Sequence, residues 1–455
     1  MRFPLLARFA IVAAVAMALL IPLSMIRDKV AERRDRAAAV QKSFADETSG
    51  PQVLAGPVLA LTCEETYVDE RVVHQKDGKP VTVREDKQRP CPLGLFLPTH
   101  LAIDGNVPLQ TRHRGIYPIH LYEAALDLSG KFDVPPAPAQ DGFRRVWKEA
   151  YLLLAISDVR GIKNAPRALI AGGSHEFLPG TIDARFKSGL HAPIGGYDDL
   201  KGEPELGFRI LLALAGTVRL QIAPVGRLNE IQIASAWPHP SFMGGYSPDQ
   251  RTISAQGFTA SWRVSQFATG GTSFWLDALA SDKLFSNARL LGAALVEPVN
   301  AYSMSYRATE YGFLFVLLTF AAFGLVELVW GVKLHPMHYA LTGSALAVFF
   351  LLLIALSEHI HFGWAYLAAA VACVTLLTFY LKHPLANIAR TSLFATLFAS
   401  LYGALYVLLK SEDHSLLLGS LLVFGVLAAV MLLTRKLDWT QFSRRLHPAA
   451  ATADA

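Results

Sequence analysis

Acidic and histidine side chains in two short polar segments are the residues best suited to chemistry. One segment holds Glu358, His359 and His361, and the other holds Glu412, Asp413 and His414. Carboxylates and imidazoles that converge could bind Zn²⁺ or another divalent cation, or pass a proton. Helix capping and loop hydration are the favoured alternative, because polar loop residues need no special explanation. We therefore predict no metal site and no cofactor, and keep the six residues as functional candidates at one rim of a helix bundle.

Glu327 is the one acid well inside an apolar stretch. A carboxylate within lipid is costly unless it is paired, protonated or facing a cavity. A local structural pair is favoured because only one such acid exists, and His335 and His338 lie near the same end of the span. A proton pathway would need titratable groups at several depths, and the sequence offers no such chain.

Two prolines flank a histidine in the segment Trp237, Pro238, His239, Pro240. They fix the backbone and argue against a regular strand. The favoured interpretation is a rigid loop that packs Trp237 and Phe242 onto a sheet, because tryptophan usually contributes packing area. The alternative is a recognition loop for a partner or glycan, in which Trp237, His239 and Phe242 would make the contacts.

Of three cysteines, Cys63 and Cys91 fall in the region expected to be exported, and Cys373 falls in an apolar span. Exported thiols are normally oxidised, which favours a Cys63–Cys91 bridge. Two thiols in strands too distant to bridge are the alternative. Cys373 is expected to be a small buried hydrophobic residue.

Enzyme motifs are largely missing from the chain. The sequence has no nucleophile elbow, Walker loop or dinucleotide fingerprint. His175 and Glu176 begin like a zinc-protease helix, but Pro179 stands where the second histidine is needed, so we expect a turn there. We predict that the protein is not an enzyme.

The amino-terminal elements that must position these residues are helical. Residues 9–26 are apolar or small and uncharged, which is just long enough to span a bilayer. A cleaved signal peptide is the alternative, but no small-residue cleavage site ends the run, so we predict an uncleaved anchor over residues 1–26. Residues 27–47 should continue it as a charged helical stalk that stops at Ser49, Gly50 and Pro51.

The middle of the chain has the residue pattern of a β-rich domain. Short β-prone runs alternate with turn signals from about residue 53 to 305. Asp77–Lys79 and Asp104–Asn106, each with a central glycine, resemble tight turns. Residues 27–308, including the stalk, are expected to form one large or two modest cores.

After residue 310 the chain is almost entirely apolar. We predict five membrane spans and a tail at 436–455, so that 309–435 forms a bundle; the spans are 312–332, 338–356, 362–381, 391–409 and 415–433. The fold class is therefore a membrane protein: an α-helical transmembrane bundle, with one amino-terminal anchor plus five carboxyl-terminal spans, and a large β-rich periplasmic domain.

The basic residues of the bundle are distributed asymmetrically. One side receives Lys333, Lys382, Arg390, Arg435, Lys436, Arg444 and Arg445, whereas the other side receives only Lys410. The positive-inside rule then places both termini in the cytoplasm and residues 27–308 outside. Basic residues 27–36 argue the other way for the anchor alone, but five consistent spans outweigh one.

Overall composition excludes several classes of protein. Hydrophobic residues make up 52% of the 455 residues and charged residues 17%. This is too few charges for an ordinary soluble chain and too apolar for a disordered one. The net charge of +5 leaves residues 27–308 only slightly positive, so no basic domain remains for nucleic acid. The partners expected are the lipid bilayer and a periplasmic or envelope protein.

Several short motifs are distinctive when taken together. The soluble motifs are QVLAGP at 52–57, RGIY at 114–117, LSGKF at 128–132, DVRGI at 158–162, SAWPHPSF at 235–242 and EPVNAY at 297–302. In the bundle, the motifs are LTF at 318–320, SEHI at 357–360, ED at 412–413 and LLGS at 417–420. With them the chain resembles the CreD family of bacterial inner-membrane proteins, which is named for cell-envelope integrity. The resemblance covers nearly the whole chain and implies an anchor, a periplasmic domain and a multi-span bundle in the inner membrane.

Family membership would imply a role in envelope stress, tolerance of an E-type colicin and the response to β-lactams. It supplies no catalytic mechanism. The leading hypothesis is thus a non-enzymatic protein that supports envelope integrity, with the rim coupling its soluble domain to the bundle. A small-solute or ion transporter and an envelope hydrolase are the alternatives. No inverted repeat or broken midspan helix marks a transporter in the sequence.

Overall fold

The computed structural model describes residues 5–74, 80–140, 143–182, 188–202, 204–279, 289–295, 301–330, 332, 334–385, 387–411 and 414–435. The chain divides into two compact units. The helical unit comprises Met1–Ala38 and Val299–Ala455, and the β-rich unit comprises Ala39–Pro298. The amino-terminal division falls inside the segment expected to be the stalk.

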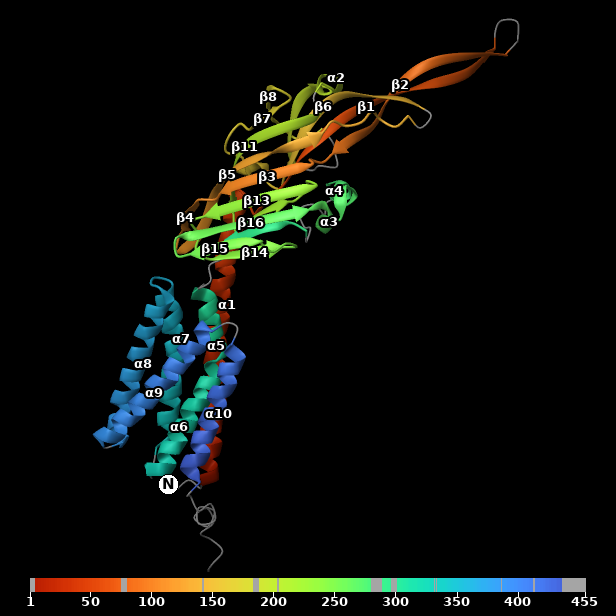
Figure 1. Ribbon diagram of the computed structural model, residues 1–455. Coiled ribbons are helices and arrows are strands. Elements are labelled where there is room, and N and C mark those ends of the chain that lie inside the picture. Colours follow the sequence, from red (N-terminus) through yellow and green to blue (C-terminus); the bar gives the residue numbers. More distant parts are fainter. Residues whose placement is uncertain are drawn as a thin grey trace, which may run out of the picture. The chain divides into compact units, whose positions relative to one another are not determined.

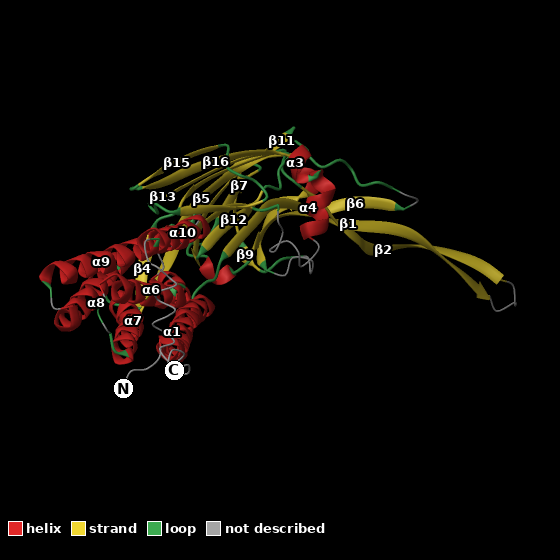
Figure 2. Cartoon of the chain, turned by 90° about the horizontal axis from the view of Figure 1, so that it is seen from below, coloured by secondary structure: helices red, strands yellow, loops and turns green. Residues whose placement is uncertain are grey.

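The β-rich unit contains two sheets among its described residues (Figure 2). The eight-stranded sheet has the order β14-β17-β12-β1-β6-β10-β9, with β2 beside β1. Its strands are β1 Gln52–His74, β2 Pro80–Phe96, β6 Arg144–Ile156, β9 Leu178–Pro179, β10 Gly189–Gly196, β12 Arg219–Ala223, β14 Pro240–Gly244 and β17 Leu291–Leu295.

The nine-stranded sheet has the order β15-β16-β13-β3-β5-β11-β7-β8, with β4 beside β5. Its strands are β3 His100–Asn106, β4 Leu109–Arg114, β5 Tyr117–Asp133, β7 Arg167–Ile170, β8 Gly173–Glu176, β11 Glu205–Thr217, β13 Leu228–Ser235, β15 Gln250–Ser254 and β16 Gly257–Ser265. The short helices are η1 Val159–Gly161, α2 Tyr197–Leu200, α3 Gln266–Thr269 and α4 Gly271–Leu279.

One buried cluster draws on both sheets, with Leu54 and Leu59 from one and Ile103, Leu126 and Ile231 from the other. Strands of the nine-stranded sheet alternate buried and exposed residues, as β11 and β13 show. This alternation is typical of a sheet with one face on the core and one in solvent. The two sheets therefore share a single core.

Strand β1 changes character along its length. Residues 52–61 are buried throughout. Here β1 is an inner strand, with β6 on one side and first β12, then β2, on the other. Its pairing with β6 ends at Thr66, and residues 67–74 pair only with β2. This two-stranded extension, which we call the arm, projects beyond the rest of the sheet (Figure 1).

Three local predictions were wrong. Asp104–Asn106 is not a turn but the end of β3, between β5 and β13, where Gly105 fits because a Cβ there would lie 2.9 Å from Leu126 Cδ2. His175 and Glu176 lie in β8 rather than in a turn. Pro240 opens strand β14 at a sheet edge, where a missing N–H is tolerated. Asp77–Lys79 lies outside the described residues.

Helix α1, Leu5–Glu47, runs without interruption through the expected anchor and stalk. Its charged part is stabilised by pairs at helical spacing, with Glu32 accepting from Lys29 and Arg36. The helix ends just before Ser49, Gly50 and Pro51, as their turn-forming character predicts.

The helical unit also contains α5 Ala301–Glu310, α6 Gly312–Trp330, α7 Pro336–Ser357, α8 Phe362–Leu385, α9 Ile388–Lys410 and α10 Ser415–Thr434. Among the described residues, four helices are long and apolar enough to cross a membrane, or up to five if the pair α5–α6 counts as one span. The long helices are α1, α7, α8 and α9, whereas α10 qualifies only as a shorter apolar helix.

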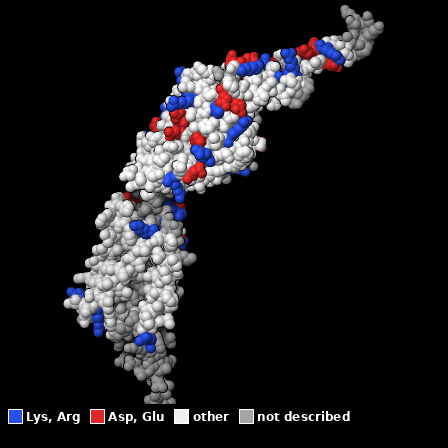
Figure 3. Space-filling view, viewed as in Figure 1, with Lys and Arg blue, Asp and Glu red and all other residues white. Residues whose placement is uncertain are grey.

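The span expected at 312–332 corresponds to α6. A separate helix precedes it: residues 302–310 and 312–327 form two helices at 47° across a break at Tyr311. The sequence pattern did not predict a helix over 302–310. Charged side chains gather over the β-rich unit and its arm, whereas the helical unit is mostly uncharged on the face in view (Figure 3).

Candidate functional site

The carboxyl-terminal end of α1 is held by side chains from two distant segments of the β-rich unit. Arg114, at the end of β4, donates to Glu47 Oε1 at 2.9 Å and to Ser43 Oγ at 3.5 Å. Arg160, in η1, donates to the backbone oxygen of Asp46. These donors reach the last turn of α1, where backbone oxygens have no partner within the helix.

Gln52 and Asp158 complete this arrangement just beyond the helix. Gln52 is fully buried, and its amide donates to the backbone oxygens of Asp158 and Ala215, at 2.9 and 3.0 Å. Asp158 accepts from Gly50 N at 3.2 Å and from the Arg160 guanidinium at 2.7 and 2.9 Å. We call Gln52, Arg114, Asp158 and Arg160 the α1 socket.

Electrostatics hold the socket in its charged form. The Arg160 guanidinium, with help from the backbone N–H of Gly50, keeps the pKa of Asp158 below its ordinary value. The hydrogen bond from Arg114 likewise lowers the pKa of Glu47. Both carboxylates are therefore ionised at neutral pH and act as acceptors.

A second set of contacts fixes α1 inside the helical unit. Arg27 donates to the Tyr306 hydroxyl of α5 at 3.0 Å and lies 3.5 Å from Glu310 Oε1. The Arg34 guanidinium lies over the Tyr306 ring, 4.8 Å from its centroid. These contacts clamp the start of the charged part of α1 onto α5.

Glu358, one of the predicted rim residues, also contacts α1. Its Oε1 lies 3.7 Å from Arg33 Nε, and its side chain is only 11% exposed. A nearly buried carboxylate needs such a cation close by. The structure therefore places Glu358 against the stalk.

The other rim candidates are His359, His361, Glu412, Asp413 and His414. His361 Nδ1 accepts from Gly363 N at 3.2 Å and so caps the start of α8, while His359 is exposed. His414 precedes α10. Glu412 and Asp413 lie outside the described residues. In the part of the chain that the structure describes, no three His, Cys, Asp or Glu side chains form a group that could hold a metal ion.

Glu327 has a partner different from the histidines expected. The Tyr339 hydroxyl of α7 donates to Glu327 Oε2 at 3.3 Å. His335 instead caps α7, because its Nδ1 accepts from Met337 N at 3.2 Å, and His338 Nδ1 lies 3.1 Å from the His335 backbone oxygen. A local pair across α6 and α7 thus accounts for the carboxylate.

Trp237 and Phe242 pack against the core of the β-rich unit. Trp237 Nε1 donates to the His239 backbone oxygen at 3.0 Å, and the Trp237 ring lies 4.8 Å from that of His120. Phe242 meets Phe258 edge-on at 5.6 Å. His239 itself is exposed. This geometry agrees with the packing interpretation, and recognition by this segment stays a prediction.

Cys63 and Cys91 are joined at the base of the arm. They lie directly opposite each other on β1 and β2, with Cα atoms 5.0 Å apart. Next to them, Glu65 accepts from Arg89 on β2 and from Arg145 Nε on β6, the latter at 2.9 Å. The disulfide and the ion pairs of Glu65 therefore join β1, β2 and β6 at the base of the arm. We call these bonds the cross-tie.

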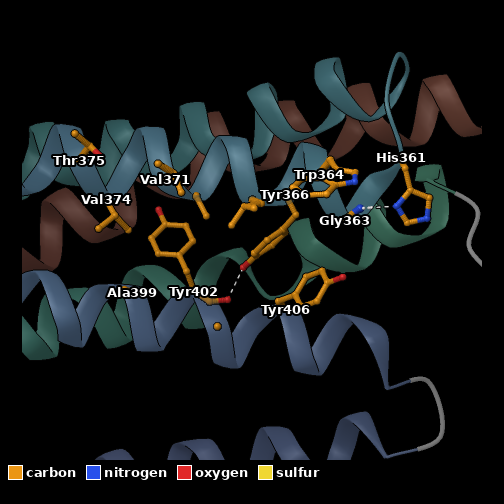
Figure 4. A pocket seen from close by; sticks show the side chains of 13 residues that line it. His361, Gly363, Trp364, Tyr366, Val371, Val374, Thr375, Ala399, Tyr402 and Tyr406 are labelled. Atoms are coloured by element: carbon orange, nitrogen blue, oxygen red, sulfur yellow. Dashed lines mark hydrogen bonds between the residues drawn. The ribbon is translucent and has the colours of Figure 1, made fainter.

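A groove of about 640 Å³ lies between α8 and α9 (Figure 4). Its lining is almost entirely apolar or aromatic, with His361 at one end. Tyr366, buried behind it, donates to the Tyr402 backbone oxygen at 2.7 Å and joins the two helices. No residue pattern in the sequence marks this groove, because apolar helices have the same composition with or without a gap between them.

The residues of the α1 socket are not recognisable as a functional site from the sequence alone, although they lie in three of the family motifs. Gln52, Arg114, Asp158 and Arg160 lie in the motifs at 52–57, 114–117 and 158–162. Each motif alone is a short polar break in a β-rich region. Only the fold shows that all three meet at the end of one helix.

Comparison with known proteins agrees with the motifs. The family model described as "Inner membrane protein CreD" matches residues 4–440. The "Inner membrane protein CreD" of Escherichia coli (strain K12) is 33% identical over 426 residues, which cover 93% of this chain and 91% of that protein. With its apolar helices and its β-rich unit, this chain therefore belongs to the CreD family of inner membrane proteins.

Proposed function

We propose that this protein supports the integrity of the cell envelope without catalysing a reaction. Its apolar helices would hold it in the inner membrane as a multi-pass protein with both termini in the cytoplasm. The β-rich unit would lie in the periplasm and act on an envelope partner. Under this proposal the protein contributes to envelope stress tolerance, including tolerance of E-type colicins and the response to β-lactams.

The α1 socket is the observation that carries the proposal. One continuous helix contains both an apolar stretch able to span a membrane and a carboxyl-terminal end fixed by charged hydrogen bonds. Arg27, Arg33 and Arg34 fix the same helix to α5 and α7. A helix held in both units can transmit a change in one unit to the other.

Complementation of a strain that lacks the gene tests this function. Arg160→Ala removes two sets of socket bonds and should reduce colicin tolerance and β-lactam survival toward the deletion level. Arg209→Ala is the matched control, because Arg209 pairs with Asp127 on the same unit at 2.6 Å but lies outside the socket. Equal rescue by both variants at equal membrane levels would contradict the proposal.

Transport of a small solute is a second candidate, and the bend between α5 and α6 favours it. Broken helices form substrate sites in many transporters because their ends expose backbone groups. Flux measured in vesicles containing the purified protein would separate the two functions. Solute uptake that is lost in a variant of the bend, with the socket intact, would replace the non-catalytic, non-transporting proposal.

A further inference from the structure

We propose that the groove between α8 and α9 binds one acyl chain of a phospholipid, with the phosphate at the end where α8 begins. The proposal does not depend on the function proposed above. It commits the groove to a lipid, and it rests on the shape, the polarity and the length of the groove.

The shape follows from small residues on the two helices. Ala370 on α8 and Ala399 and Gly403 on α9 line the groove, between larger residues such as Val371 and Val374. A Cβ added at Gly403 would meet no atom within 4 Å. The gap is therefore open space beside Gly403, and a side chain placed there would fill it.

The imidazole of His361 and the hydroxyl of Tyr406 lie together at one end of the groove, whereas the far end has only the hydroxyl of Thr375. A Cβ at Gly363 would lie 3.2 Å from the Tyr406 hydroxyl and 3.4 Å from His361 Nδ1, so both polar groups adjoin Gly363. His361 Nδ1 accepts from Gly363 N, which leaves Nε2–H of the neutral ring as a donor. Exposed Lys410 follows Tyr406 by one helical turn and adds a positive charge on the same face.

These groups match a phosphate ester at a membrane interface. Donors and a cation suit an anionic phosphate. Trp364, 68% exposed beside them, is a residue type enriched at the level of lipid headgroups. Beyond this end the lining is apolar down to Val374, as an acyl chain requires.

The length of the groove suits one acyl chain. The lining runs from His361 to Thr375, or about 21 Å along α8. One leaflet of the hydrocarbon core is about 15 Å thick, so an acyl chain with its ester region spans the groove.

The test uses the full chain in vesicles of phosphatidylethanolamine and phosphatidylglycerol. A trace of phosphatidylglycerol carries a photoactivatable group in its acyl chain, and labelled peptides are mapped by mass spectrometry. We expect labelling concentrated on α8 and α9 residues of the groove. Gly403→Phe should reduce it about tenfold, which is about 1.4 kcal/mol of lost binding.

Matched variants guard against a folding artefact. Gly425→Phe places the same side chain on the exposed face of α10, where a Cβ also meets nothing within 4 Å, and should leave groove labelling unchanged. Val371→Phe narrows the groove from α8 and should act like Gly403→Phe. Lys410→Glu should weaken labelling by the anionic lipid and leave an analogue without phosphate unaffected.

Uniform labelling of all apolar helices, unchanged by Gly403→Phe and Val371→Phe, would overturn the proposal. Photochemical coupling of the groove to a second copy of the chain or to another protein, in place of lipid, would overturn it as well.

Discussion

Asp158 is the residue on which the most socket bonds converge. It accepts from Gly50 and Arg160, and its pKa lies below the ordinary value because of these donors. A carboxyl with a lowered folded pKa stabilises the fold above its ordinary pKa and loses that effect as the pH falls through the lowered value. The stabilisation of the fold by the ionised Asp158 carboxylate should therefore be complete at neutral pH and decrease below about pH 4.

The substitution Asp158→Asn removes the negative charge and keeps a side chain of the same size with an oxygen that can still accept hydrogen bonds. We expect it to lower the unfolding free energy of the β-rich unit by about 1–2 kcal/mol at neutral pH, after allowance for solvent screening. The difference from wild type should shrink in acid. Thermal unfolding of the full chain in detergent across a pH series measures this, and a pH-independent difference would argue against the ionic role.

Gly161 makes the socket possible by its lack of a side chain. A Cβ there would lie 2.3 Å from the Ala215 backbone oxygen and 2.4 Å from Gln52 Nε2. Gly161→Ala should therefore destabilise the β-rich unit by about 1–3 kcal/mol, as overpacking does. Gly207→Ala on β11, where a Cβ meets nothing within 4 Å, is the control. Equal melting temperatures of the two variants would contradict this prediction and would show that Ala215 and Gln52 can shift to make room for the added methyl group.

Residue types predicted some of these roles and concealed others. The cysteine pair was predictable from compartment and spacing, and a local partner for Glu327 from the cost of an unpaired acid. The socket was not predictable, because Arg114 and Asp158 have ordinary surface composition and meet Glu47 and Gly50 only through the tertiary fold.

At the scale of elements, the arm depends on the cross-tie at its base. A two-stranded ribbon alone is marginally stable in water. Cys63→Ser removes a link between residues 28 apart and should lower stability by about 3–4 kcal/mol in the chain-entropy description. Limited proteolysis should then cut the arm faster than in wild type, both in β1 after Thr66 and in the part of β2 that pairs with it.

Cys373→Ser is the matched control, because this buried thiol lies in α8. Mass spectrometry of unreduced protein should give one linked peptide containing Cys63 and Cys91. Alkylation of both thiols in protein from intact cells would contradict the bridge and weaken the expected location of the β-rich unit.

Helix positions were more predictable than helix shapes. Hydropathy places α7, α8 and α9 within a few residues of their observed bounds, because long apolar runs have few alternatives. It also predicts the span that α6 forms, but not helix α5, which precedes α6 at an angle of 47° across a break at Tyr311. Composition does not encode this bend.

For the whole molecule, the basic residues between spans predict the topology. Reporter fusions after Asp438 and within the β-rich unit should report opposite sides of the membrane, with the β-rich unit outside. A cytoplasmic β-rich unit would overturn the proposed periplasmic role together with the oxidised state of Cys63 and Cys91.

The division into an apolar helical part and a β-rich part was predictable, since hydropathy changes sharply along the chain. The sequence did not show that α1 belongs to both units, with Ala38 and Ala39 on either side of the division. Its composition changes at residue 27, but its packing changes a full three turns later.

The α1 socket also has a consequence for how the sequence can drift over generations. Glu47 pairs with Arg114, 67 positions away, and Asp158 pairs with Arg160, which also reaches the backbone of the same helix end. A lineage that loses the charge of one member of a pair leaves its partner unmatched, and a second change in that partner then restores the fit. Across descendants of a common ancestor, Glu47 and Arg114 should therefore substitute together, and so should Asp158 and Arg160.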